Sequence, residues 1–177
     1  MRSAAKFFQA LNPVLCGAGG HFEFTDREYA ITCGSHYAEP IHLKTVDSIL
    51  HKAGLTAEAI QGGTVTSLKW TYALELASRG ETLTPLHSDC SGKHAGMLAS
   101  AVFQGLSTNN YLQPGHPVQQ QILDIISAIT QYPKSQIQIG IDGCSAPVHA
   151  MPLYYMALGF ARFAKSQVLA TSTARAA

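Results

Sequence analysis

Charged side chains are scarce in this chain, where they make up 13% of the 177 residues, against roughly 25% in an average soluble domain. Twelve basic side chains against eleven acidic ones leave a net charge of +1. So small a charge gives no electrostatic attraction for nucleic acid or for anionic lipid. We therefore expect neither a nucleic acid nor a membrane surface as a partner.

Cysteine and long apolar runs are also in short supply. The chain has four cysteines, which are Cys16, Cys33, Cys90 and Cys144. So few cysteines at such wide spacing exclude a disulfide-dense secreted module. They favour free thiols in a reducing, cytoplasmic compartment. The longest uncharged apolar stretch, Ala150 to Ala161, has twelve residues, fewer than the ~18 that span a bilayer. Polar residues and Pro13 interrupt the N-terminal residues, which argues against a signal peptide.

Apolar residues make up 46% of the chain, enough to build a hydrophobic core. Periodicity, caps and turn residues predict helices over 3–11, 41–50, 70–78, 93–103, 118–129 and 153–164. Short strands are predicted at 29–33 and 136–141. Helices dominate and the strands are too few for a complete sheet, which indicates part of an α+β protein. We expect one partial domain over residues 1–166, followed by a small polar tail over 167–177 that frays.

Ser3 and Lys6 form the first group of reactive side chains. Residues three apart share one face of a helix, so the two side chains could meet. A serine becomes a good nucleophile when a neighbour takes its proton, and a desolvated neutral lysine can do so. This spacing is common by chance, and the alternative interpretation is an exposed first turn.

Two further segments carry polar groups at the ends of predicted elements. Ser35 and His36, with His42 nearby, follow the strand predicted at 29–33; they could be ligands, acid–base groups or simply polar loop residues. The segment 90–94 opens a helix, and the segment 142–144 ends a strand. Thiols in two turns, with nitrogen donors beside one of them, suit zinc, although the C-x-x-C pairs of a structural zinc module are missing. The pattern around Lys93 lacks the glycine and the hydroxyl residue of a phosphate loop, which disfavours nucleotide binding.

Five blocks of sequence together resemble the asparaginase II family, the rhizobial-type L-asparaginases. They extend in order over residues 2 to 164, and the string from Cys90 to Gly96 is the most specific. The blocks are Arg2-Ser3-x-x-Lys6-x-Phe8-Gln9, Ser35-His36 with Glu39-Pro40-x-His42, Thr84-Pro85-Leu86-His87 with Cys90-Ser91-Gly92-Lys93-His94-Ala95-Gly96-Met97-Leu98, His116-Pro117-Val118-Gln119, and Asp142-Gly143-Cys144-x-Ala146-Pro147.

The resemblance implies a fold similar to serine β-lactamases and glutaminases, and hydrolysis of L-asparagine to L-aspartate and ammonia. It leaves a homodimer open. It further implies the following roles: Ser3 with Lys6 as one Ser-Lys pair and Ser35 as the serine of a second; Cys90, Lys93 and Cys144 as ligands of a zinc ion; Arg2, His94 and Asp142 at the substrate site. A lysine binds a metal only as the free amine.

The chain departs from the family pattern in two respects. Members of the family are longer at both ends, so the resemblance implies a fragment that lacks the strands before Ser3 and the later lysine expected to partner Ser35. Such a fragment is expected to have little activity alone. Smaller departures occur at Phe7, at Tyr37-Ala38 and at Ser88-Asp89.

Two other interpretations compete with this one. A β-lactamase or penicillin-binding relative would also carry Ser-x-x-Lys, but should add Ser-x-Asn and Lys-Thr-Gly motifs. Here Ser88-Asp89 runs into Cys90, and Lys44-Thr45 runs into Val46, so neither motif is completed. A non-catalytic truncated gene product or a zinc-binding remnant is the second alternative.

Overall fold

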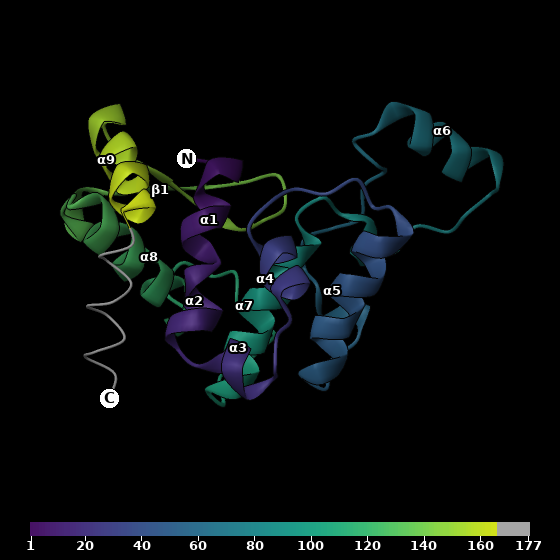
Figure 1. The fold of residues 1–177 in the computed structure, drawn as a ribbon, viewed down its shortest axis with the longest axis horizontal. Coiled ribbons are helices and arrows are strands. Elements are labelled where there is room, and N and C mark those ends of the chain that lie inside the picture. The colour runs from purple at the N-terminus through teal and green to yellow at the C-terminus, as the bar shows by residue number, and fades with distance from the viewer. Residues whose placement is uncertain (166–177) are drawn as a thin grey trace.

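A computed structural model describes residues 1–165 of the chain. Within these residues, helices make up most of the chain and a two-stranded antiparallel sheet lies at one edge (Figure 1), which confirms the prediction of a helix-rich α+β chain. The tail predicted for 167–177 lies outside the described residues. The elements are α1 (Lys6–Gln9), α2 (Leu11–Leu15), α3 (Ala18–His21), α4 (Asp26–Thr32), α5 (Pro40–Lys52), α6 (Trp70–Ser78), α7 (Ser91–Phe103), α8 (Pro117–Thr130), β1 (Gln138–Ile141), β2 (Pro147–Ala150) and α9 (Leu153–Ala164).

Helix α7 contacts α2, α3, α4, α5 and α8 and forms the centre of the fold (Figure 1). Every residue from Ser91 to Ala101 is buried, and most of them are small. A Cβ on Gly92 would lie 2.2 Å from the backbone oxygen of Ile31, and one on Gly96 would lie 3.1 Å from a methyl of Thr32. The two glycines thus let α4 approach closely, and this packing fixes the N-terminal end of α7.

Replacing Gly92 with alanine is expected to lower the free energy of unfolding by about 2 to 3 kcal/mol, because the new methyl group meets backbone that cannot rotate away. Urea unfolding followed by circular dichroism measures the change. Gly20→Ala is the matched control, since a Cβ there has no atom within 4 Å and alanine is the better helix former. Equal midpoints for wild type and Gly92→Ala would contradict the close packing of α4 on α7.

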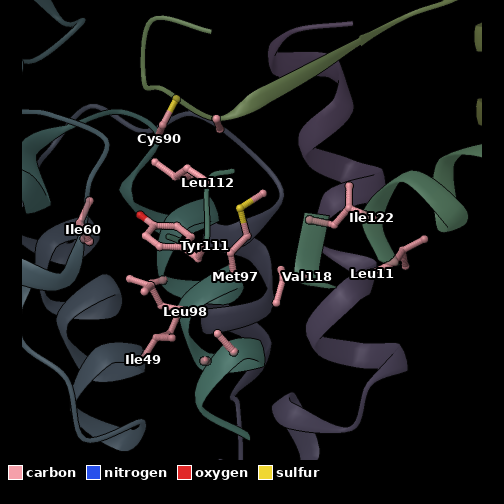
Figure 2. Close-up of a cluster of buried hydrophobic side chains, with 14 of the residues drawn as sticks. Leu11, Ile49, Ile60, Cys90, Met97, Leu98, Tyr111, Leu112, Val118 and Ile122 are labelled. Carbon is pink, nitrogen blue, oxygen red and sulfur yellow. The ribbon is translucent and has the colours of Figure 1, made fainter. Parts of the chain in front are cut away.

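The main cluster of buried apolar side chains joins α7 to α5 and α8 (Figure 2). Tyr111, which is fully buried in this cluster, also connects the core to the chain around the site. Its hydroxyl accepts a hydrogen bond from the Gln61 backbone N–H at 3.1 Å and lies 2.6 Å from Nδ1 of His94. The core therefore holds both the 61–62 segment and the His94 ring in place.

Strands β1 and β2 form a hairpin in which Gln138 pairs with Ala150 and Ile141 with Pro147. The predicted strand at 136–141 is confirmed from Gln138 onward, after a 3-10 turn at Lys134–Gln136. Sequence patterns did not predict β2, which is short and begins with a proline. The loop of the hairpin closes through a hydrogen bond from the Asp142 N–H to the Ala146 carbonyl at 2.9 Å. This loop carries the 142–144 segment toward the N-terminal end of α7.

The predicted end of the first helix is wrong. A helix over 3–11 was expected to stop at Asn12-Pro13, but the chain is helical again from Leu11 to Leu15. Pro13 has no N–H to donate to the carbonyl of Gln9, four residues earlier, so the helix breaks there and then continues. The interruption separates α1, which carries Lys6, from α2.

The predicted strand at 29–33 is also wrong, because this segment belongs to α4. Thr25 and Glu28 form a capping box: the Thr25 N–H donates to a Glu28 carboxylate oxygen at 2.6 Å, and the Glu28 N–H donates to the Thr25 hydroxyl at 3.3 Å. This cap starts a helix that overrides the strand preference of the residues after it.

The helices predicted at 70–78 and 153–164 are confirmed at both ends, and the other predicted helices are confirmed with shifted ends. Figure 1 shows α6 apart from the other helices, and its first residue, Trp70, is largely exposed. Every helix within residues 1–165 falls short of the length and apolar character that a membrane span requires.

Candidate active site

A pocket of about 220 Å³ lies where the first residues of the chain meet the turn before α7 and the β1–β2 loop. It brings together groups that are up to 142 residues apart in the sequence, from Arg2 to Cys144. The predicted site residues that line it are Arg2, Ser3, Cys90, Asp142 and Cys144. The other four, Lys6, Ser35, Lys93 and His94, are not among its lining residues.

Lys6, on α1, is 1% exposed and points toward the loop between α4 and α5. Its Nζ donates a hydrogen bond to the Ser35 hydroxyl at 2.6 Å. The Ser35 hydroxyl in turn donates to Oδ2 of Asp89, which lines the pocket, at 2.9 Å. Ser35 was expected to lack a lysine partner within this chain; that expectation is wrong, because Lys6 occupies the position of a partner.

Ser3 lies in the 3-10 turn Ser3–Ala5 and its side chain is exposed at the pocket. The backbone N–H of Lys6 donates to the Ser3 carbonyl. Within residues 1–165, however, the side chains of Ser3 and Lys6 share no hydrogen bond. The lysine expected to contact Ser3 therefore contacts Ser35.

Arg2 and Asp142 meet across the pocket wall. Nε of Arg2 donates to Oδ1 of Asp142 at 2.7 Å, and Nη2 lies 2.6 Å from the same oxygen. The backbone N–H of Gly143 donates to this oxygen as well, at 2.9 Å. The Arg2 side chain is largely exposed, whereas that of Asp142 is nearly buried. A cation and an anion are thus held side by side at the pocket.

Cys90, Lys93 and Cys144 gather at the N-terminal end of α7. Nζ of the buried Lys93 donates to the sulfur of Cys144 at 3.2 Å. A hydrogen bond with Cys90, helped by His94 and by the charge of Lys93, holds the pKa of the Cys144 thiol far below its ordinary value. The same hydrogen bond, with burial, raises the pKa of Cys90. These opposite shifts favour the thiolate at Cys144 and the thiol at Cys90.

Within residues 1–165 no three His, Cys, Asp or Glu side chains gather as a metal site, so a zinc ion held by the two cysteines would need the Lys93 amine as a third ligand. Zinc binds thiolates and nitrogen donors, and it would deprotonate both sulfurs on binding. Both cysteines are free, without a disulfide, and both line the pocket. The two cysteines thus border the pocket, whereas Lys93 lies behind them.

His94 is fully buried and lies behind the pocket wall. Nδ1 contacts the Tyr111 hydroxyl, whereas Nε2 has no hydrogen-bond partner among residues 1–165. A Cβ on Gly62, which lines the pocket, would lie 2.9 Å from that Nε2. Burial lowers the pKa of His94, and the ring is neutral. His94 is therefore placed to support Cys144 and the pocket wall rather than to contact a small molecule directly.

The site includes groups that the sequence did not single out. Asp89 contacts Ser35, and Gly62 gives the His94 ring room beside the pocket. A sequence signal existed for Asp89, which immediately precedes Cys90 in a turn rich in helix-capping residues. Tyr111 gave no such signal, because its role depends on tertiary contacts.

His36, considered above as a ligand or an acid–base group, ties the Ser35 loop to α7. Its Nδ1 accepts from the Ala38 N–H at 3.1 Å, so Nε2 carries the proton and donates to the Ser91 hydroxyl at 2.8 Å. Ser91 in turn donates to the Leu86 carbonyl at 2.9 Å. Burial, aided by the nearby His42, lowers the pKa of His36 to about 4.

This buried histidine predicts loss of stability in acid. In the unfolded chain His36 titrates near its ordinary value of 6.5, and in the folded chain at about 4. Below 6.5 the unfolded state binds more protons, so the free energy of unfolding falls as the pH drops toward 4, by up to about 3 kcal/mol. Urea unfolding between pH 7.5 and 4.5 measures this slope. His36→Gln should make it shallower and His51→Gln, at an exposed position, should not; equal slopes in all three proteins would contradict the prediction.

Comparison with known proteins bears directly on these features. No curated protein matches the chain. A model of the family described as L-asparaginase II matches residues 1–177. Since this match covers the chain from end to end, the chain belongs to the L-asparaginase II family.

Proposed function

We propose that this chain forms the active site of an L-asparaginase, an amidohydrolase that converts L-asparagine to L-aspartate and ammonia. The observation that carries the proposal is the 2.6 Å contact between Lys6 Nζ and the Ser35 hydroxyl, beside a pocket that holds the Arg2–Asp142 ion pair. Family membership supports it. The proposal includes a fold of the serine β-lactamase and glutaminase type.

Hydrolysis of an amide requires a nucleophile, stabilisation of developing negative charge and a proton for the departing ammonia. Ser35 Oγ attacks the side-chain amide carbon, ammonia leaves, and water then hydrolyses the resulting ester. Lys6 Nζ donates to Oγ and is placed to stabilise the negative charge that develops there, whereas the hydroxyl proton is directed at Oδ2 of Asp89, from which it can pass to the departing nitrogen. Ser3, on the pocket wall, contacts the bound substrate.

The Arg2–Asp142 pair offers recognition of the amino-acid end of the substrate. The exposed Arg2 guanidinium suits the α-carboxylate, since a guanidinium binds carboxylates with two parallel hydrogen bonds. The Asp142 carboxylate suits the α-ammonium group. A pocket of about 220 Å³ admits a small amino acid rather than a peptide.

A zinc ion belongs to the same proposal. Cys90, Lys93 and Cys144 would hold it, and His94 would support Cys144 from behind. When bound, zinc polarises a substrate carbonyl as a Lewis acid. The Lys93 amine must lose its proton to become a ligand, whereas Arg2 and Asp142 stay outside the ligand set and open their ion pair to bind the substrate.

A coupled ammonia assay on the purified chain tests the proposal. The sequence predicts little activity for a fragment, but the contact of Lys6 with Ser35 supports release of ammonia from L-asparagine. We expect a lower rate from L-glutamine, whose longer side chain displaces the amide from Ser35. The alternative is a non-catalytic zinc-binding protein, and the one observation that favours it is the pair of neighbouring cysteines, Cys90 and Cys144. This alternative predicts that the chain binds zinc but releases no ammonia from L-asparagine or L-glutamine. That second result would overturn the enzymatic proposal.

A further inference from the structure

Asp89 lines the pocket and contacts Ser35. The family resemblance implies no role for this residue. Its Oδ2 accepts the hydrogen bond of the Ser35 hydroxyl at 2.9 Å and lies 3.7 Å from Nζ of Lys6. The side chain is 23% exposed and lines the pocket. The chain also departs from the family pattern at this position.

The backbone joins the same two segments. The carbonyl of Asp89 accepts a hydrogen bond from the N–H of His36, the residue after Ser35, at 3.2 Å. Asp89 is therefore bound to the Ser35 loop through its main chain and its side chain together. Such a double connection fixes the distance between the carboxylate and the hydroxyl.

We propose that Asp89 is a positioning residue for Ser35. It holds the serine hydroxyl in one rotamer, with the proton directed at Oδ2 and a lone pair left free for attack on the substrate. This inference deepens the proposed function and rests on it, because it assigns the orientation of the same nucleophile.

The geometry explains why two partners are needed. A serine hydroxyl bonded to Lys6 alone can still rotate, because the lysine occupies only one lone pair. A second partner that takes the hydroxyl proton removes this freedom. Productive catalysis requires placement within roughly 0.5 Å, which two hydrogen bonds of 2.6 and 2.9 Å on Oγ can supply.

Two substitutions separate positioning from charge. Asp89→Ala and Asp89→Asn both remove the negative charge near Lys6, but only asparagine keeps an oxygen that accepts the Ser35 hydrogen bond. A positioning role predicts that alanine lowers kcat on the order of 10- to 100-fold with KM unchanged, and that asparagine recovers most of the loss. A role confined to compensating the charge of Lys6 predicts equal losses in the two variants.

The experiment follows ammonia release and, independently, the rate at which a fluorophosphonate probe labels Ser35, located by peptide mass spectrometry. Asp47→Ala, at an exposed position on α5, is the matched control. We expect labelling of Ser35 to slow 10- to 100-fold in Asp89→Ala, to recover in Asp89→Asn and to stay unchanged in Asp47→Ala. Melting curves check that each variant folds. If Asp89→Ala does not fold, the asparagine variant decides: a near-wild-type kcat in Asp89→Asn supports the inference. A loss of kcat of more than about tenfold in Asp89→Asn overturns it.

The outcomes also separate this inference from the proposed function. Wild-type labelling of Ser35 in Asp89→Ala, or equal slowing in both Asp89 variants, overturns the positioning role even when ammonia is released from L-asparagine. Labelling that depends on Asp89 without any release of ammonia supports the positioning role and overturns the assignment of the substrate.

Discussion

Ser35→Ala is expected to abolish hydrolysis of L-asparagine, with a loss in kcat of at least about 1,000-fold, the scale seen when a nucleophile is removed. The reason is the contact of its hydroxyl with the buried Lys6 Nζ. Ser3→Ala is expected to lower kcat/KM by about tenfold or less, since Ser3 offers at most a hydrogen bond to the substrate. Ammonia release at several substrate concentrations gives kcat and KM for each variant.

The two serines serve as controls for each other, because both are exposed and both lie near the pocket. Lys6→Met tests the pair from the other side: it keeps the length of the side chain and removes the amine, and its loss should resemble that of Ser35→Ala. A severe loss in Ser3→Ala with a mild one in Ser35→Ala would show that Ser3 is the nucleophile and that the observed pairing of Lys6 is not the catalytic one.

Sequence reasoning recovered most of the helices, because their patterns are local. The run from Trp70 to Ser78 and that from Leu153 to Ala164 carry helical periodicity and boundary signals in the residues themselves. It failed at α4, where residues with strand preference follow a capping box. It also missed β2, since a four-residue strand that starts with Pro147 becomes recognisable only when β1 pairs with it.

Five of the nine predicted site residues line one pocket, but the contacts between them could not be predicted from the sequence. Arg2 and Asp142 were expected at the same site, and their ion pair joins residues 140 positions apart. The partner of Lys6 was predicted from helix spacing, which favours Ser3. Helix spacing cannot predict where the loop after α4 lies. The close packing of α4 on α7 positions this loop, and in it Ser35 lies within 2.6 Å of Lys6.

The metal proposal leads to the second large effect, the loss of zinc on Cys144→Ser. We expect the purified chain to bind one zinc ion, measured by inductively coupled plasma mass spectrometry after dialysis against zinc-free buffer. Removal of a thiolate ligand should weaken zinc binding more than about 100-fold, since loss of even an indirect partner of a metal ligand costs 10- to 100-fold. Cys144 carries the negative charge of the pair, so its loss also removes the strongest attraction for the cation.

Cys16→Ser is the matched control. Cys16 is a free, partly exposed thiol that follows α2 directly and lines a different pocket. It should keep its zinc. Lys93→Met should lose zinc as Cys144→Ser does, because the change removes a nitrogen donor and the usual protein ligands of zinc are cysteine, histidine and carboxylates. Retention of zinc by Cys144→Ser, or loss from Cys16→Ser to the same extent, would contradict the site. Zinc lost from Cys144→Ser but kept in Lys93→Met would restrict the protein ligands to the two cysteines and leave Lys93 as the cation that holds the Cys144 thiolate, through the 3.2 Å contact that the structure shows.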